Sequence, residues 1–450
     1  MKRSCFVFMI LLFALNSNSQ SWQPLQGGID NYGRTLFTDS LSGKLFVGGR
    51  FSHVNGNIDY GISAWNGSSW DTSYGLGNNG CLAAAYGFIR YQNELYTIGE
   101  VASSFDNQIL GDFTRWNGTQ WDSLNKGFSS FFGCDYDGLP WGFCEYNNLL
   151  YTIGGFDTVD NYYSPGIVAW NGTNWIQMGL PNYESYSNGS IAACSVYQNE
   201  LYIAGNFADT VGNLIGCAKF DGVNWTEVGL GGGGLVFCMA VYNNELYIGG
   251  HFIGPNNANL VKFDGINFTD INFNGRVDNL KVIDNKLFAV VGSQGIFTTG
   301  NATIYDNIAV WDGTNWSDFS NDTLHGGLSD IAVFNNEIYV IGNFNSFNSV
   351  TGFNNIAKYN GWTVGENKLK EKNEISIYPN PVSSLLTIHN QSGITNYDLE
   401  IKNVLGQQVY IQQINNSKNP SIDVSHWNNG VYFYQIISNK ETVRGKFVKE

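Results

Sequence analysis

Residues 200–207 read ELYIAGNF and residues 219–225 read KFDGVNW, and versions of these two segments recur along most of the chain. The first segment returns as KLFVGGRF at 44–51, ELYIGGHF at 245–252 and EIYVIGNF at 337–344. The second returns as AWNGSSW at 64–70, VWDGTNW at 310–316 and, shortened, as KYNGW at 358–362. Periods of 20–50 residues are typical of propellers, solenoids and repeat arrays. The aromatic residue of the first segment marks seven repeats, spaced 41 to 55 residues apart (Phe46, Tyr96, Tyr151, Tyr202, Tyr247, Phe288 and Tyr339).

Each repeat predicts two β-hairpins. The first joins two apolar strands through a turn such as YNNE, and the second turns at Asn-Gly or Asp-Gly, a strong hairpin signal. Two loop lengths are open for the second hairpin. With two residues Trp65 opposes Ser68, and with four residues Trp65 opposes Trp70. In either case both Trp rings lie on one face, as cross-strand aromatic pairs do.

Four strands per repeat predict an all-β fold. Strands such as residues 201–204 are apolar on both faces, which fits burial between neighbouring sheets. We therefore expect a seven-bladed β-propeller of four-stranded blades over residues 21–365. A β-solenoid is the main alternative, but its repeats are usually shorter and lack paired hairpins. Residues 22–25 (WQPL) match the strand that follows each Asn-Gly turn, so we expect the N-terminal strand to complete the last blade.

The composition excludes a disordered chain and argues against a helical one, because 54 residues are Gly, 15% are aromatic and only 14% are charged. Lys2 and Arg3 precede an apolar run at 5–15, which is shorter than the roughly 20 residues of a membrane-spanning helix. Residues 1–20 thus predict a signal peptide. No later segment is apolar enough to span a membrane, so we expect an exported chain without a transmembrane segment.

The charge changes abruptly near residue 366. Residues 21–366 hold 12 Lys and Arg against 31 Asp and Glu, a net charge of −19, whereas residues 367–450 hold 9 against 7, or +2. This shift predicts a charged linker at 366–374 and a separate domain at 375–450. The acidic first part argues against nucleic acid or an anionic membrane as partner. We expect a monomer.

Cysteine and histidine patterns offer little chemistry. Cys134 and Cys144 flank one loop and are the predicted disulfide pair, while the other cysteines are expected to be small buried apolar residues. No C-x-x-C, H-E-x-x-H or G-x-S-x-G motif is present, so we expect no metal site and no cofactor. The loops at 157–160 and 209–213 could offer oxygen ligands for weak calcium binding at most.

One face of the expected propeller collects the variable loops. In a four-stranded meander both hairpin turns lie at one end, so all length variation falls in the connections at the other end. The insertions there are aromatic and acidic, which suits stacking and hydrogen bonding to sugars. The candidate ligand-binding residues are Asp135, Tyr136, Asp137, Trp141, Tyr162 and Tyr163.

Over residues 30–366 the repeats resemble kelch-type propeller repeats. They are closer still to the G-G-x-F … A-x-W-D-G-x-x-W units of fungal bud-site landmark propellers and of similar bacterial surface proteins. The resemblance implies an architecture more than an activity, because propellers host enzymes, lectins and scaffolds alike.

The C-terminal part carries four segments in order: ISIYPNP at 375–381, NVLGQQV at 403–409, NNGVYFY at 428–434 and GKFVKE at 445–450. Their alternating strands predict a small immunoglobulin-like β-sandwich. Together they resemble the type A C-terminal sorting domain of the type IX secretion system of Bacteroidota. That resemblance implies contact with the secretion machinery, passage across the outer membrane, and a cell-surface or extracellular location. The residues that carry it are Pro379, Asn380, Pro381, Gly406, Gln407, Gly430, Tyr432, Lys446, Phe447 and Lys449.

Function can be predicted only by class. We expect an exported, non-catalytic binding or adhesion module for a glycan or a protein. The alternative is a glycosidase or lyase that uses carboxylates of the variable-loop face, such as Asp135 and Asp137. A purely structural surface component is a third reading.

Overall fold

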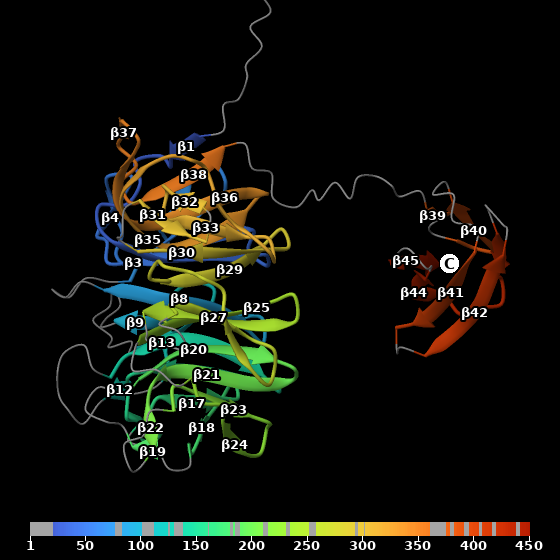
Figure 1. Ribbon diagram of the computed structural model, residues 1–450, viewed down its shortest axis with the longest axis horizontal. Helices are drawn as coiled ribbons and strands as arrows, with labels where there is room; N and C mark the ends of the chain where they lie inside the picture. The colour runs from blue at the N-terminus through green and yellow to red at the C-terminus, as the bar shows by residue number, and fades with distance from the viewer. Residues whose placement is uncertain are drawn as a thin grey trace, which may run out of the picture. The chain divides into compact units, whose positions relative to one another are not determined.

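The computed structural model describes residues 21–76, 83–100, 112–124, 127–129, 138–160, 162–180, 183–184, 190–209, 215–230, 235–251, 258–292, 296–300, 302–360, 375–378, 382–390, 396–404, 407–415, 420–437 and 442–450. The chain divides into two compact units, Met1–Val364 and Gly365–Glu450, here called unit 1 and unit 2. The described residues form strands and turns but no helix, so the all-β class is confirmed (Figure 1). The predicted signal peptide at 1–20 and linker at 366–374 lie outside the described residues.

The described part of unit 1 contains seven antiparallel sheets with four strands on their main path, numbered here as sheets 1 to 7 in chain order. Sheet 1 consists of β2 (Gly33–Asp39), β3 (Lys44–Gly49), β6 (Ile62–Trp65) and β7 (Trp70–Asp71). Sheet 2 consists of β8 (Ala84–Tyr91), β9 (Glu94–Glu100), β10 (Phe113–Trp116) and β11 (Trp121–Ser123). Sheet 3 consists of β13 (Pro140–Tyr146), β14 (Leu149–Gly154), β17 (Ile167–Trp170) and β18 (Trp175–Gln177). Sheet 4 consists of β20 (Ser190–Tyr197), β21 (Glu200–Asn206), β23 (Cys217–Phe220) and β24 (Trp225–Glu227).

Sheets 5 and 6 repeat the same chain order, and sheet 7 begins its order with a strand from the start of the chain. Sheet 5 consists of β25 (Leu235–Tyr242), β26 (Glu245–His251), β27 (Leu260–Phe263) and β28 (Phe268–Asp270). Sheet 6 consists of β29 (Asn279–Ile283), β30 (Lys286–Val290), β33 (Ile308–Trp311) and β34 (Trp316–Asp318). Sheet 7 consists of β1 (Ser21–Pro24), β38 (Ile356–Asn360), β36 (Glu337–Phe347) and β35 (Leu324–Phe334). Short strands lie in the loops: β4 (His53–Val54), β5 (Asn57–Ile58), β12 (Phe128–Ser129), β15 (Thr158–Val159), β16 (Tyr162–Tyr163), β19 (Tyr183–Glu184), β22 (Ala208–Asp209), β31 (Phe297–Thr299), β32 (Ala302–Ile304) and β37 (Val350–Thr351).

The N-terminal strand completes sheet 7, as the sequence predicts. β1 pairs antiparallel with β38, with Trp22 opposite Tyr359, and Figure 1 shows β1 (blue) beside β38 (orange). The first strands of consecutive sheets are in contact, from β2 through β8, β13, β20, β25 and β29 to β35, and β35 contacts β2. The sheets therefore follow one another around a closed circuit.

The turns show why these residues form hairpins. In the first hairpin of sheet 5, Asn243 and Asn244 have φ of 48° and 60°, the left-handed pair that a tight type I′ turn requires. In the second hairpin of sheet 1, Trp65 lies opposite Trp70, so the loop has four residues. The Asn66 side chain accepts hydrogen bonds from the Ser68 and Ser69 backbone nitrogens, both at 2.9 Å, and closes that loop.

The core of unit 1 lies between neighbouring sheets. Phe46 and Ile62 of sheet 1 pack against Ala85 and Leu95 of sheet 2, and all four are fully buried. The second strand of each sheet is therefore apolar on both faces, because each face meets a different neighbour.

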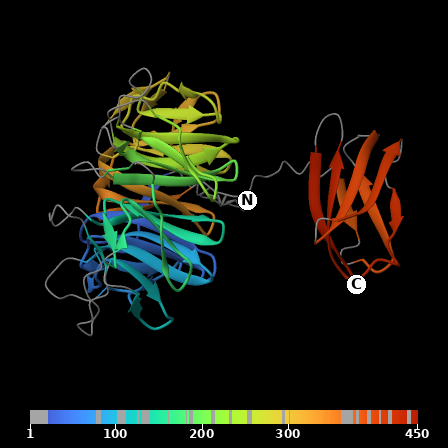
Figure 2. The same ribbon diagram turned by 90° about the horizontal axis from the view of Figure 1, so that it is seen from below.

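Unit 2 is a sandwich of two sheets (Figure 2). One holds β39 (Ile375–Tyr378), β40 (Leu385–Asn390) and β43 (Ser421–Asp423), and the other holds β42 (Gln408–Asn415), β41 (Asn396–Asn403), β44 (Gly430–Ile437) and β45 (Thr442–Lys449). Leu386 and Ile388 of the first sheet share one core with Leu399, Ile401 and Phe447 of the second.

The disulfide between Cys134 and Cys144 stays a prediction. Cys144 is a buried free thiol on β13, and its side chain interacts with Cys194 of the neighbouring β20. It thus points into the packing between sheets 3 and 4. Cys134 itself lies outside the described residues.

The buried thiols should react slowly in the folded protein. Burial raises the pKa of Cys217 to about 12 and that of Cys238 well above its usual range, so little thiolate is present at pH 8. We expect Cys144, Cys194, Cys217 and Cys238 to be alkylated by iodoacetamide at least tenfold faster in guanidinium than in buffer, measured by peptide mass spectrometry. If Cys144 stayed unlabelled in guanidinium until a reductant was added, the result would support the predicted disulfide.

Candidate functional site

A pocket of about 820 Å³ opens where the first strands of all seven sheets begin. Each sheet contributes lining residues from the start of its first strand or from the residues just before it. The connections between sheets, and those between the second and third strands, lie at this same end. The pocket, here called the central pocket, is therefore surrounded by the loops whose lengths vary.

β-Bulges select the residues that line the central pocket. In six sheets the pairing of the first two strands shifts by one residue near the start of the first strand, and the extra residue lines the pocket. A bulge leaves one residue unpaired and turns its side chain away from the regular alternation. Asp278 of sheet 6 occupies the corresponding place just before β29. We call this set the bulge ring: Arg34, Tyr86, Trp141, Ala192, Phe237, Asp278 and Ser329.

The bulge ring has an apolar side and a polar side. Tyr86, Trp141, Ala192 and Phe237 come from the consecutive sheets 2 to 5, and the remaining three come from sheets 6, 7 and 1. Trp141 lies over Gly155, where a side chain would come within 3.3 Å of its ring. The apolar side thus offers aromatic surface for a flat apolar ligand face.

Two arginines stack on aromatic rings of the pocket wall. The guanidinium carbon of Arg34 lies 4.3 Å from the centre of the Tyr86 ring, and that of Arg276 lies 4.4 Å from the centre of the Phe237 ring. The Tyr86 hydroxyl donates to Glu100, and burial together with Glu100 raises the pKa of Tyr86 well above its usual range. Tyr86 is therefore a neutral phenol that supports a cation.

Both carboxylates of the central pocket are fully engaged by protein groups. Asp330 is buried and accepts hydrogen bonds from the Leu36 backbone nitrogen at 2.9 Å and from Asn279 Nδ2 at 2.8 Å. Asp278 accepts from Arg276 Nε at 2.9 Å on Oδ1 and from the Gly292 nitrogen at 2.7 Å on Oδ2. These carboxylates hold the pocket wall together.

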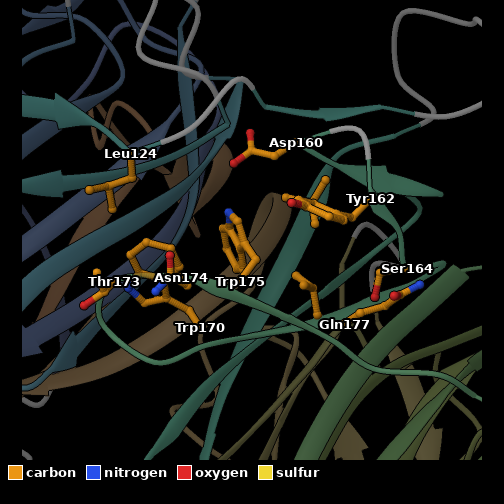
Figure 3. A pocket seen from close by; sticks show the side chains of 11 residues that line it. Leu124, Asp160, Tyr162, Ser164, Trp170, Thr173, Asn174, Trp175 and Gln177 are labelled. Atoms are coloured by element: carbon orange, nitrogen blue, oxygen red, sulfur yellow. The ribbon is translucent and has the colours of Figure 1, made fainter.

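The structure divides the sequence-predicted ligand residues between two places. Trp141 lies in the central pocket, whereas Tyr162 lies on β16 and lines a separate groove of about 500 Å³ with Asp160, Trp175 and Gln177. Figure 3 shows Trp175 in the middle of this groove, with Asp160 and Tyr162 beside it. Tyr163 is exposed next to Tyr162, outside the set that lines the groove. Asp135, Tyr136 and Asp137 lie outside the described residues.

Sequence reasoning missed six of the seven bulge-ring residues, although a signal was present. Each lies five residues before the last residue of its strand, as Tyr86 does before Tyr91 and Phe237 before Tyr242. That position changes type from repeat to repeat, while the residues after it keep their pattern. A variable position inside a recurring strand was therefore the signal that marked these residues.

Within the described ranges, no group of three or more His, Cys, Asp or Glu side chains could hold a metal ion. Among the described residues no helix has the length and apolar character needed to cross a membrane.

The sorting residues of unit 2 separate into core and surface. Tyr432 and Phe447 are buried and stacked at 5.5 Å, and the Tyr432 hydroxyl donates to the Asn428 carbonyl. Gln407 and Gly430 are exposed, as is Lys446. Lys449 is buried and donates through Nζ to the Glu450 backbone oxygen. Pro379, Asn380, Pro381 and Gly406 lie outside the described residues.

Residues 376–450 match the secretion system C-terminal sorting domain. This domain marks export through the type IX secretion system to the cell surface or the extracellular space. No curated protein matches the chain.

Three solved structures are similar to parts of the chain. A DUF3244-family protein with an immunoglobulin-like β-sandwich fold from Bacteroides vulgatus has 23% identity and a TM-score of 0.16, over 17% of this chain and 84% of its own. The extracellular domain of a one-component system from B. thetaiotaomicron has 11% identity and a TM-score of 0.34, over 95% of this chain and 59% of its own. BamB from Moraxella catarrhalis has 9% identity and a TM-score of 0.37, over 73% of this chain and 82% of its own.

Proposed function

We propose that sheets 1 to 7 are the blades of a seven-bladed β-propeller built from kelch-like repeats. The closed circuit of contacts between first strands supports this reading, as does the seven-fold recurrence of both hairpin segments. Residues 1–20 then serve as the signal peptide, and the immunoglobulin-like sandwich of unit 2 directs the chain to type IX secretion.

We further propose that the exported propeller is a binding module that holds its ligand in the central pocket. The observation that carries this proposal is the bulge ring, because a β-bulge in each of six sheets presents one side chain to a single cavity and Asp278 of sheet 6 adds a seventh. Ligand pockets combine aromatic walls with a few placed polar groups, and this ring has that character. Adhesion and nutrient capture are both served by such a site.

The engaged carboxylates favour binding over glycoside hydrolysis. A glycosidase needs two carboxyl groups free to exchange protons or attack the sugar, about 5–10 Å apart. In the described part of the central pocket Asp278 and Asp330 each use both oxygens on protein donors. A lining that combines aromatic rings with the amides of Asn206 and Asn343 suits a glycan better than an extended peptide. Asp135, Tyr136 and Asp137 extend this ligand face in the proposal.

Replacing Trp141 with alanine tests the site. We expect Trp141→Ala to weaken retardation in polysaccharide gels by about 10–100-fold, because it removes aromatic stacking worth roughly 1.5–3 kcal/mol. The measurement is affinity electrophoresis of the full chain through gels with neutral and acidic polysaccharides and with immobilised peptides. Tyr162→Ala is the matched control in the separate groove and should bind as the parent does. Binding by Trp141→Ala equal to that of the parent would exclude the central pocket as the binding site. Turnover of a retained polysaccharide would mean that the protein is an enzyme instead of a binding module.

A further inference from the structure

Arg34 is the one arginine in the described part of unit 1 without a carboxylate partner. Arg50, Arg90, Arg115 and Arg276 each form an ion pair with an Asp or Glu side chain. Arg34 instead stacks over Tyr86 and lines the central pocket. Residues 21–366 hold 31 acidic residues against 12 basic ones, so a guanidinium left without a carboxylate there is available to a ligand.

The neighbours of Arg34 keep this cation available. The nearby Glu100 is already paired with Arg50 and accepts a hydrogen bond from the Tyr86 hydroxyl. Asp330 accepts from the Leu36 nitrogen and Thr35 Oγ1, which follow Arg34 on β2, and its other oxygen accepts from Asn279. These two carboxylates of the neighbouring sheets 2 and 7 are therefore held by other donors.

The rest of the bulge ring defines the ligand around the charge. A guanidinium fixed on an aromatic ring presents a planar fork that fits a carboxylate through two parallel hydrogen bonds. Trp141 and Phe237 present aromatic surface on the apolar side of the same pocket, and Asn206 and Asn343 add amides that can bind hydroxyls. A ligand that matches the guanidinium, the aromatic surface and the amides has a carboxylate, an apolar ring face and several hydroxyl groups.

We propose that the central pocket binds a hexuronic acid residue of an acidic polysaccharide, with its carboxylate on Arg34 and its ring against the aromatic side of the bulge ring. This inference rests on the proposed binding function and names its ligand class. An acidic peptide would supply the carboxylate but neither the flat ring face nor the hydroxyls, so it is the competing outcome of the test. Long-range repulsion from the acidic surface is screened beyond about 8 Å at 0.15 M salt, and the contact at Arg34 then decides.

Matched polymers with and without the carboxylate test the proposal. The full chain is run through gels of polygalacturonate, alginate or hyaluronate, and through gels of the same polymers with their carboxyl groups reduced to alcohols, at 0.15 M NaCl. We expect retardation by at least one acidic polymer, a loss of about 10–100-fold on its reduced form, and the same loss in Arg34→Gln. Arg34→Lys should retain part of the binding, because it keeps the charge but not the fork.

The controls separate this inference from the proposed function. Arg115→Gln, outside the pocket, should bind as the parent does. Arg34→Gln should lower the unfolding temperature by no more than a few degrees, because Arg34 forms no ion pair and the variant loses only the stacking on Tyr86. Equal retardation by an acidic polymer and its reduced form, or undiminished binding by Arg34→Gln, overturns the hexuronic acid assignment and leaves a binding module. Failure of all three acidic polymers also overturns it, and retention by poly-glutamate at equal strength assigns the pocket to an acidic protein. Only a chain that no gel or peptide retains contradicts the binding function as well.

Discussion

Trp22→Ala should lower the free energy of unfolding of unit 1 by about 3–5 kcal/mol, the range for loss of a large buried aromatic side chain. Trp22 is 6% exposed, stacks on Phe347 at 4.7 Å and meets Tyr359 at 4.9 Å. Its Nε1 donates to Ser320 Oγ at 3.1 Å. These partners, Ser320, Phe347 and Tyr359, lie near the C-terminal end of unit 1. The substitution therefore weakens the pairing that completes sheet 7 as well as the core of that sheet. Differential scanning calorimetry of the full chain separates this transition from that of unit 2.

Trp225→Ala is the matched control, because Trp225 occupies the same place in sheet 4. It is only half-buried, its nearest ring partner is Phe220 at 4.9 Å, and its Nε1 finds no acceptor among the described residues. We expect a loss of about 1–2 kcal/mol. If the two variants were equally stable, β1 would contribute no more to the stability of unit 1 than an ordinary outer strand.

The repeat architecture could be predicted because local signals and burial agree in every repeat. The Asn-rich turns demand positive φ, the second strands are apolar on both faces, and residues 22–25 match the strand that sheet 7 lacks. Each of these features is written in consecutive residues. These features can therefore be recognised without knowing which sheets become neighbours.

The bulge-ring residues could be predicted only in part, because they converge from seven separate sheets. Trp141 was found through its loop, whereas Arg34 and Phe237 reach the same pocket through β-bulges, whose trace in the sequence is a single variable position within each recurring strand. The predicted Cys134–Cys144 pair rests on a similar local argument and stays a prediction, because Cys134 lies outside the described residues. Closeness along the chain suggested the pair, but the strand geometry aims Cys144 at Cys194 in the next sheet.

The buried carboxyl group of Asp59 makes the stability of unit 1 depend on pH. Asp59 is 1% exposed, and neither of its oxygens accepts a hydrogen bond in the structure. Burial raises the pKa of this carboxyl from 3.8 to about 7; the charge of Asp71 adds to the rise, and the nearby Ser63 hydroxyl opposes it. The folded state therefore holds the proton more tightly than the unfolded chain. That stabilisation is complete below pH 4 and is lost as the pH rises through 7.

Asp59→Asn should remove this dependence, because the amide is neutral at every pH and nearly the same size. We expect the variant to match the parent at pH 4 and to exceed its free energy of unfolding by about 2–4 kcal/mol at pH 8, the order that a three-unit pKa difference implies. Urea unfolding at pH 4, 6 and 8 measures the difference. Asp221→Asn is the control: Asp221 caps an exposed turn through the Val223 and Asn224 nitrogens, which lower its pKa and keep it ionised throughout pH 5–8. The free energy of unfolding of Asp221→Asn should change with pH as that of the parent does. If the free energy of unfolding of Asp59→Asn changed with pH in the same way, the carboxyl of Asp59 would titrate in contact with water.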